Sequence, residues 1–399
     1  MHIPTILSTA FLAGLVATHP GHDHTQELKE RAEFLAQNKN DLSHCADKLR
    51  ARGVHASNIK RRNALTGNLL KKRGLDGREA FTPSIQKSHE SLAEYTARTD
   101  PSVLFAGNAS CVLSPEQIEG PYYVAGEYIR QDITDEEAGV PLAVDIQIVD
   151  MDTCLPIPDV YLEIWHCNST GVYGGVVAQG NGNGAADMSN LNNTMFRGAQ
   201  KTDKEGAVQF HTMFPGHYIG RTTHIHVAVH LNATAQPNGT LMDLTAAHVG
   251  QIYFDQELID AVETQSPYTE NTQALTTNAQ DFLLQQAAAV SDPFMEYVFL
   301  GEQGDFAGGL MSWISFGINV TLAREMSAAS TLYAEGGKAN PAPPGGGFPP
   351  GGFPPGFTFP PGAFPPGFPT GGFPTAAPLP TTGGLPTADP LPTPSPLMN

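Results

Sequence analysis

Thr222-Thr-His-Ile-His-Val-Ala-Val-His230 is a stretch in which apolar side chains alternate with other residues, at Ile225, Val227 and Val229. Such alternation places the apolar side chains on one face of a β-strand and the histidines on the other. The same period-two pattern recurs, between turn-forming residues, at 142–149, 160–166, 207–213, 251–254, 294–299 and 310–320. Short strands at this spacing predict a mainly β fold, namely a β-sandwich with long loops.

A second pattern precedes the strands. Between residues 26 and 97, apolar side chains recur at helical spacing, as at Leu42, Cys45 and Leu49, among lysines, arginines and glutamates. This spacing predicts two to four amphipathic helices, and we assign an α-helical N-terminal region to residues 18–105. The region can pack on the sandwich, mediate homodimerisation or serve as a propeptide, and the sequence leaves all three open. Its basic clusters at 60–62 and 71–73 are interpreted as solvated helix faces, with propeptide cleavage sites as the alternative.

The β-sandwich domain is assigned to residues 106–335, with a helix or two in 256–289, and two segments flank the folded part. Residues 1–17 contain a short apolar run followed by small residues, which is the plan of a secretory signal peptide. Residues 336–399 form the other segment, in which Gly-Phe-Pro-Pro units repeat from Pro341 on and are followed by a stretch rich in Thr and Pro. That composition cannot bury a continuous apolar face, so we predict a disordered tail that acts as a spacer, with cell-wall or matrix association as its role.

Secretion is also indicated by sequons and cysteines. Asn-x-Ser/Thr sequons predict a glycoprotein, and they begin at residues 108, 168, 192, 232, 238 and 319. The four cysteines, Cys45, Cys111, Cys154 and Cys167, form an even set that allows three disulfide pairings in an oxidising compartment. Cys154 and Cys167 flank one predicted strand, so they are candidates for a bridge to each other or to Cys111.

Charge is distributed unevenly along the chain, whose formal net charge is −18. Residues 101–340 hold seven basic and 28 acidic side chains, whereas residues 23–100 hold fifteen basic and eleven acidic ones. An acidic domain is repelled by nucleic acids and by anionic membrane surfaces. We therefore expect neither nucleic acid nor a membrane as a partner.

The quoted strand also carries the clearest chemical signal. His224 and His226 project from one strand face about 6.6–6.8 Å apart, which lets both imidazoles bind one metal ion. No His-x-Asp or His-x-Glu motif occurs in the chain, which counts against the two-histidine, one-carboxylate site of many ferrous enzymes. Tyr173 and Tyr218 offer phenolates instead, which are hard anions that suit a trivalent ion.

Ordered motifs over residues 110–260 resemble the intradiol ring-cleavage dioxygenases, that is, the catechol 1,2- and protocatechuate 3,4-dioxygenases, and especially their secreted fungal relatives. In chain order the motifs are Glu119-Gly-Pro-Tyr-Tyr-Val124, Glu163-Ile-Trp165 through Tyr173, Arg197-Gly-Ala-Gln-Lys-Thr-Asp-Lys-Glu-Gly206, Pro215-Gly-His-Tyr218, Arg221 through His226, and Gln251-Ile-Tyr-Phe254. The resemblance implies a non-haem Fe(III) bound by Tyr173, Tyr218, His224 and His226.

The resemblance also implies an activity, which is the cleavage of an aromatic diol by O2 between the two hydroxyl-bearing carbons to give a cis,cis-muconate. In that reaction Tyr218 would leave the iron and accept a proton from the diol. Arg221 and Gln251 would stabilise charge on the ring and the reacting oxygens, and Tyr122 would line the substrate mouth.

Two other interpretations are left open by the sequence. One is a non-catalytic secreted β-sandwich module displayed on the tail, and the other is a copper site formed by His19, His22 and His24.

Two further residues lie in or next to the motifs but are not expected at the metal site. We place Trp165 in the sandwich core, and we expect His217 to point to the strand face opposite Tyr218, away from the metal.

Overall fold

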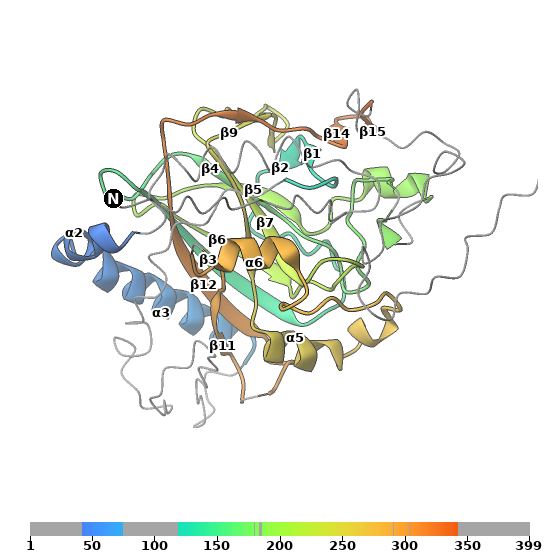
Figure 1. The fold of residues 1–399 in the computed structure, drawn as a ribbon, viewed down its shortest axis with the longest axis horizontal. Coiled ribbons are helices and arrows are strands. Elements are labelled where there is room, and N and C mark those ends of the chain that lie inside the picture. The colour runs from blue at the N-terminus through green and yellow to red at the C-terminus, as the bar shows by residue number, and fades with distance from the viewer. Residues whose placement is uncertain are drawn as a thin grey trace, which may run out of the picture. The chain divides into compact units, whose positions relative to one another are not determined.

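The computed structural model describes residues 42–74, 119–178, 180–182, 186–289, 291–302 and 304–341, and Figure 1 shows how their elements are arranged. Several predicted features lie outside the described residues. They are the signal peptide at 1–17, the helical pattern before residue 42, the histidines at 19, 22 and 24, Cys111, the sequon at 108 and the tail beyond Pro341.

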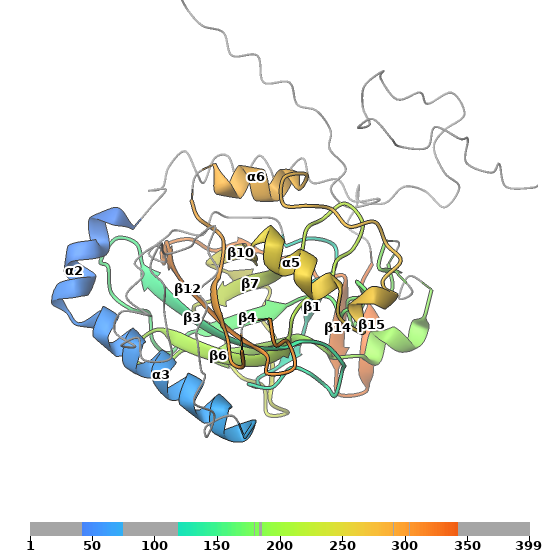
Figure 2. The ribbon, with the colours of Figure 1, turned by 90° about the horizontal axis from the view of Figure 1, so that it is seen from below.

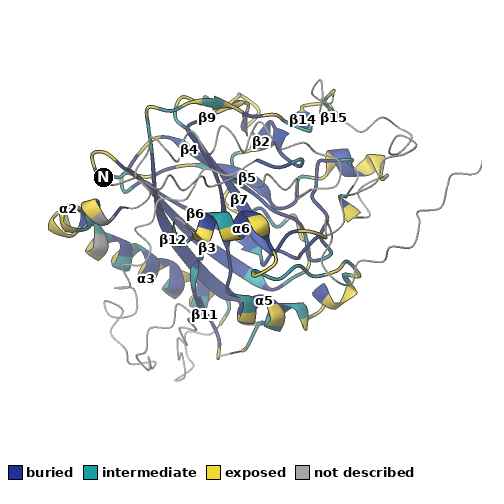
Figure 3. Cartoon of the chain, viewed as in Figure 1, coloured by how far each residue is buried: buried dark blue, intermediate teal, exposed yellow. Residues whose placement is uncertain are grey.

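Two four-stranded β-sheets pack against each other, which confirms the prediction of a mainly β fold. One sheet has the order β10-β7-β4-β5 and the other β11-β12-β3-β6. Apolar side chains from both sheets meet in one buried core, with Ile164 from the first sheet and Ile146 and Phe316 from the second. Figure 3 shows both sheets as largely buried. The strands are β3 (Pro141–Asp150), β4 (Tyr161–Trp165), β5 (Arg197–Lys201), β6 (Ala207–Met213), β7 (His224–His230), β10 (His248–Tyr253), β11 (Glu296–Phe299) and β12 (Leu310–Ile318).

All of the predicted strands are present, but β5 was not among them. Its sequence, Arg197-Gly-Ala-Gln-Lys201, has no apolar alternation, and only its antiparallel pairing with β4 makes it a strand. The prediction of a helix or two in 256–289 is confirmed by α5 (Gln256–Glu263) and α6 (Phe282–Ala288). None of the described helices has the length and apolarity needed to cross a membrane. The short elements are β1 (Val124–Ala125), β2 (Glu127–Tyr128), η3 (Met188–Asn192), β8 (Thr240–Leu241), β9 (Thr245–Ala246), η4 (Tyr268–Glu270) and β13 (Arg324–Glu325).

The N-terminal helices pack on the outer face of the β11-β12-β3-β6 sheet. They are η1 (Ser43–Cys45), α2 (Ala46–Ala51) and α3 (Val54–Lys72), and Figure 2 shows α3 running alongside β3 and β6. Leu65 and Leu69 of α3 are buried against Met311 and Trp313 of β12. Of the three roles that the sequence left open for this region, packing on the sandwich is observed for residues 42–74.

Within the basic cluster at 60–62, Arg61 and Arg62 were wrongly interpreted as part of a solvated helix face, whereas Lys60 is exposed as predicted. The side chain of Arg62 is 2% exposed and that of Arg61 12%, and both bond to Asp145, which is fully buried on β3. Arg61 donates from Nε and Nη2 to the two Asp145 oxygens at 2.9 Å each, and Arg62 donates from Nε at 3.1 Å. The helical pattern shows which α3 residues share a face, but the acidic partner lies more than eighty residues away in the chain.

A disulfide joins Cys45 at the start of α2 to Cys154, which follows β3. It corrects the expectation that Cys154 pairs with Cys167 or Cys111. Cys167 is instead a buried thiol that donates to the carbonyl of Gly216 at 3.4 Å. The disulfide lies beside a small apolar cluster that includes Leu42, Leu49 and Val149.

Replacing Cys45 with serine is expected to lower the free energy of unfolding by about 2–5 kcal/mol, because the bridge closes a long loop in the unfolded chain. The two cysteines are 109 residues apart, which puts the expected loss at the upper end of that range. Urea unfolding of both proteins measures the difference. Wild-type protein in reductant should lose the same amount, and an unchanged midpoint in both experiments would contradict the prediction.

The folded part extends beyond the predicted domain boundary at residue 335. β14 (Ser330–Tyr333) and β15 (Gly336–Ala339) form an antiparallel hairpin, and β1 pairs with β14 in parallel. Residues 336–339 were assigned to the disordered tail together with the Gly-Phe-Pro-Pro repeats that follow them. Their backbone hydrogen bonds to β14 do not depend on side chains, so composition did not indicate the strand.

Candidate metal centre

β7 places His224 and His226 on the sheet face that points away from the sandwich core. Ile225, Val227 and Val229 of the same strand lie in the core, so the alternation predicted from the sequence is observed. Both histidines are nonetheless buried, because loops cover this outer face. Their Nε2 atoms lie 3.1 Å apart, and the Nδ1 of His224 lies 2.6 Å from the Thr222 carbonyl. Since a carbonyl can only accept, Nδ1 carries the proton and the Nε2 lone pair of His224 is left for a metal.

Neighbouring strands supply a row of side chains on the same face. Gln251 of β10 lies directly opposite His226, and Tyr253 lies opposite His224. On the other side, Trp165 of β4 is paired with His226, and their rings stack at 4.8 Å with an interplanar angle of 6°. Trp165 was expected in the sandwich core, but it packs in the cluster around the histidines instead. It is the last residue of β4 and alternates with Ile164, so it takes the opposite face.

Tyr173 reaches the histidines from the loop that follows β4. Its hydroxyl lies 3.5 Å from His224 Nε2. The backbone of Tyr173 is held by Asn181, whose Oδ1 accepts from the Tyr173 N–H at 2.7 Å and whose Nδ2 donates to its carbonyl at 2.9 Å. Asn190 donates to the same carbonyl at 2.9 Å. Asn181 and Asn190 lie in a segment rich in glycine and asparagine, yet both side chains are buried and fix a candidate ligand.

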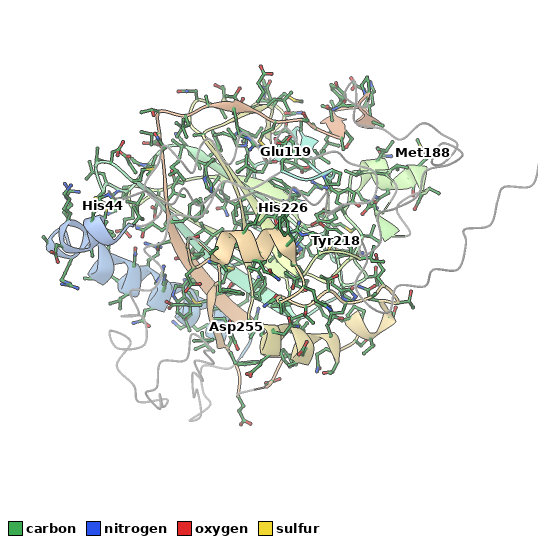
Figure 4. The ribbon with its side chains drawn as sticks, in the orientation of Figure 1. His44, Glu119, Met188, Tyr218, His226 and Asp255 are labelled. Carbon is green, nitrogen blue, oxygen red and sulfur yellow. A yellow bond between two sulfur atoms is a disulfide. The ribbon has the colours of Figure 1, made fainter. Side chains whose placement is uncertain are left out.

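Tyr218 enters from the connection between β6 and β7. Its ring centroid lies 5.7 Å from that of His224 and 5.6 Å from that of Tyr173. Tyr122 stacks on Tyr173 at 4.7 Å and meets the edge of Tyr218 at 5.7 Å. Figure 4 labels Tyr218 and His226 in this part of the fold. The structure thus brings Tyr122, both candidate tyrosine ligands and both candidate histidine ligands into one enclosed cluster.

Burial controls the protonation of these groups. It raises the pKa of the Tyr173 and Tyr218 phenols well above the ordinary value, although the positive charge of Arg221 acts in the opposite direction. Burial, followed by the charge of Arg221, lowers the pKa of His224 to about 3. At neutral pH His224 is therefore uncharged, which is the form that binds metals, whereas the phenols need a strong Lewis acid to lose their protons.

Arg221 and Gln251 meet beside the histidines. Arg221 Nη2 donates to Gln251 Oε1 and, at 3.2 Å, to the hydroxyl of Tyr253. The Tyr253 hydroxyl in turn donates to Gln251 Oε1 at 2.8 Å. Arg221 Nη1 is buried and has no hydrogen-bond partner among the described residues. An unpartnered buried donor of this kind is costly unless a ligand accepts from it.

His217 stays out of the cluster, in agreement with its exclusion. Its Nδ1 lies 2.7 Å from Glu263 Oε1, and its Nε2 lies 3.0 Å from the Gln273 carbonyl. Both ring nitrogens therefore have partners outside the cluster, even though His217 is the neighbour of Tyr218 in sequence.

The donor set fits a trivalent iron. Ligand atoms that lie about 2.0–2.2 Å from one ion are at most about 4.4 Å apart. The separations of 3.1 Å between the histidine nitrogens and 3.5 Å between Tyr173 Oη and His224 Nε2 meet this limit. Phenolate oxygens prefer hard cations, and neutral imidazoles bind iron, so the chemistry of the four side chains agrees with Fe(III).

Three residues that support the centre were not found from the sequence. Asn181 and Asp281, whose carboxylate accepts from Arg221 Nε at 2.8 Å, lie in polar stretches without a motif of their own. Tyr253 had a detectable signal, because it lies two residues after Gln251 and so shares its strand face.

Comparisons with known proteins agree on one family. Residues 118–287 match the family model described as "Dioxygenase". Catechol 1,2-dioxygenase 1 of Acinetobacter lwoffii is 34% identical over 111 residues, covering 26% of this chain and 32% of that protein. Catechol 1,2-dioxygenase of Acinetobacter baylyi is 27% identical over 213 residues, covering 47% of this chain and 60% of that protein. The chain thus spans about one third of the length of the first relative and three fifths of the length of the second.

A similar solved structure is the intradiol ring-cleavage dioxygenase from Tetranychus urticae, at 29% identity and a TM-score of 0.43. The match covers 52% of this chain and 95% of that one.

Proposed function

We propose that this protein is an oxidoreductase of the intradiol ring-cleavage dioxygenase family that acts on catechol-type aromatic diols. The proposal is supported by the family match over residues 118–287 and by the similarity to two catechol 1,2-dioxygenases. The protein cleaves the ring with O2 between the two hydroxyl-bearing carbons and yields cis,cis-muconate-type products. One observation carries the proposal, which is the convergence of the Tyr173 hydroxyl and the Nε2 atoms of His224 and His226 on one buried point.

The proposed cofactor is Fe(III), held by Tyr173, Tyr218, His224 and His226. When bound, Fe(III) makes the aromatic diol electron-poor and so activates it toward O2. The protein supplies an enclosed site for this chemistry, because all four side chains are at most 2% exposed. Exclusion of bulk water strengthens every electrostatic interaction inside the site.

Tyr218 is the proposed acceptor of a substrate proton. Because burial raises the pKa of its phenol well above the ordinary value, the phenolate becomes a strong base as soon as it is released from a cation. Its placement on a short connection, with Ile219 and Gly220 exposed beside it, is compatible with such movement. Tyr173 is held by Asn181 and Asn190 and is the phenol expected to stay in place.

Arg221, Gln251 and Tyr122 are the proposed contacts of the substrate. The buried Nη1 of Arg221 donates to an oxygen on which negative charge develops. Gln251 is held in one orientation because its Oε1 accepts from both Arg221 and Tyr253. Tyr122 provides an aromatic wall beside Tyr173, against which a planar ring can pack.

A visible absorption spectrum tests the proposal. Iron-loaded protein is expected to show a broad band from phenolate-to-Fe(III) charge transfer, which shifts to longer wavelength on anaerobic addition of catechol. Admission of O2 should then consume one O2 per ring and produce a muconate. Tyr218→Phe should weaken the band and slow turnover, whereas Tyr128→Phe, at a 40% exposed tyrosine outside the cluster, should change neither. A protein that stays colourless after iron loading would favour the non-catalytic binding module instead.

We also propose that the protein is secreted. Secretion is supported by the Cys45–Cys154 disulfide, since disulfides persist in oxidising compartments. The sequon asparagines Asn232 and Asn238 are exposed, so both are open to glycosylation. In this proposal the tail holds the enzyme at a cell wall or matrix. Recovery of the protein from the medium, with a mass that falls on removal of N-glycans, is the expected result, and retention inside the cell would contradict it.

A further inference from the structure

Asp281 is a buried carboxylate that bonds directly to Arg221, although sixty residues separate them in the chain. Both side chains are 0% exposed. Asp281 Oδ2 accepts from Arg221 Nε at 2.8 Å and from the backbone N–H of Thr222 at 2.9 Å. Its other oxygen, Oδ1, accepts from the backbone N–H of Leu284 at 3.0 Å and so caps α6.

These bonds determine how the Arg221 guanidinium is oriented. The group is planar and rigid, so fixing Nε by Asp281 and Nη2 by Gln251 and Tyr253 also fixes Nη1. Nη1 is the guanidinium nitrogen that has no hydrogen-bond partner among the described residues. Because Asp281, Gln251 and Tyr253 accept from the other two nitrogens, they determine that Nη1 is the nitrogen left for a ligand.

The charge of Asp281 matters as much as its geometry. Burial raises the pKa of an isolated carboxyl, but Arg221 and the two backbone N–H donors overcome this and hold the pKa of Asp281 below its ordinary value. Asp281 is thus ionised at neutral pH and offsets the charge of Arg221. Without it, an unpaired guanidinium would lie buried next to a centre that is proposed to bind a trivalent cation.

We propose that Asp281 is a positioning residue for ring cleavage, which fixes Arg221 so that Nη1 meets the substrate. This inference rests on the proposed function. It gives α6 a role in the site, because the helix N-terminus and Arg221 share one carboxylate.

The competing explanation is that Asp281 only caps α6. Asp281→Ser separates the two roles, since serine is a good N-cap but is too short and uncharged to pair with Arg221. Asp281→Asn is a second variant of nearly the same shape that also caps. The matched control is Leu284→Ala, which weakens the packing of α6 at a 2% exposed side chain and leaves Arg221 and Asp281 in place.

We expect both Asp281 variants to lower kcat by about 100-fold, the effect of a misplaced catalytic group, with KM changed by less than about threefold. Leu284→Ala should lower the melting temperature while kcat stays within about twofold of wild type. Amide hydrogen exchange on the full chain, with and without iron, gives a readout independent of turnover. The Thr222 amide should exchange faster in Asp281→Ser than in Leu284→Ala, because only the former loses its acceptor.

A double-mutant cycle with Arg221→Met decides whether Asp281 acts through Arg221. If it does, adding Asp281→Ser to Arg221→Met should change kcat by less than about threefold. Additive losses, or wild-type kcat in both Asp281 variants, would overturn the inference. An inactive wild-type iron protein would contradict the proposed function, and the exchange of Thr222 would still show whether Asp281 holds this segment.

Discussion

Replacement of His224 by alanine is expected to abolish both iron binding and ring cleavage. His224 is the candidate ligand whose lone pair is best defined, because its Nδ1 proton is directed at the Thr222 carbonyl and its ring is neutral at neutral pH. Loss of an outer-shell partner typically costs about 10–100-fold in metal affinity, and loss of a ligand itself should cost more. Iron content per chain after loading, the visible band and O2 uptake with catechol measure the result.

The matched control is His211→Gln. His211 lies on β6, in the other sheet, and its side chain is only partly buried near the basic end of α3. This variant should keep wild-type iron content and colour. If His224→Ala retained one iron per chain with an unchanged band, the four-residue ligand set would be wrong, and the ion would have to lie elsewhere in the protein.

Replacement of Asp145 by alanine is expected to destabilise the protein by about 3–5 kcal/mol, which is the typical loss when one partner of a buried ion pair is removed. The substitution leaves the guanidinium groups of Arg61 and Arg62 without their shared carboxylate, and Arg62 is 2% exposed. Asp145 also accepts from Gln209 of β6 at 3.1 Å, so three side chains from two elements, α3 and β6, lose a common partner. Urea unfolding followed by circular dichroism measures the change.

Asp47→Ala is the matched control, because Asp47 pairs with Arg50 on the surface, where the two side chains are 97% and 66% exposed. Its effect should stay below about 1 kcal/mol. A loss of the same small size for Asp145→Ala would mean that water reaches the Arg61–Arg62–Asp145 network. It would also contradict the view that this network fastens α3 to the sandwich.

The network also predicts a pH dependence. Burial opposes ionisation of Asp145, but Arg61 and Arg62 outweigh it and lower the pKa of Asp145 below its ordinary value of 3.8. The folded state therefore binds this proton less readily than the unfolded state does. The stabilising contribution is present above the unfolded pKa and is lost as the pH falls through the folded one. Asp145→Ala should accordingly be less sensitive to strong acid than the wild type is.

The strands of the sandwich were predictable because their signal is local. Alternation in β7 and β3 determines which side chains share a face, whatever the rest of the chain does. The same rule placed His224 and His226 together on one face. It failed for β5 and β15, where polar residues and glycines hide the strand and only pairing with a neighbour forms it.

The sequence by itself thus determined seven of the eight sandwich strands and the candidate donor set of Tyr173, Tyr218, His224 and His226, since motif and periodicity are properties of short segments. The tertiary structure alone decided what is buried and what is paired. The sequence pattern around Arg61 and Arg62 is that of a solvated helix face, but in the fold both side chains bond to the buried Asp145 of β3. Asp281 belongs to no recognisable sequence motif, and only the fold brings its carboxylate next to Arg221. Burial and charge pairing depend on distant segments meeting, and a one-dimensional pattern contains no record of those distances.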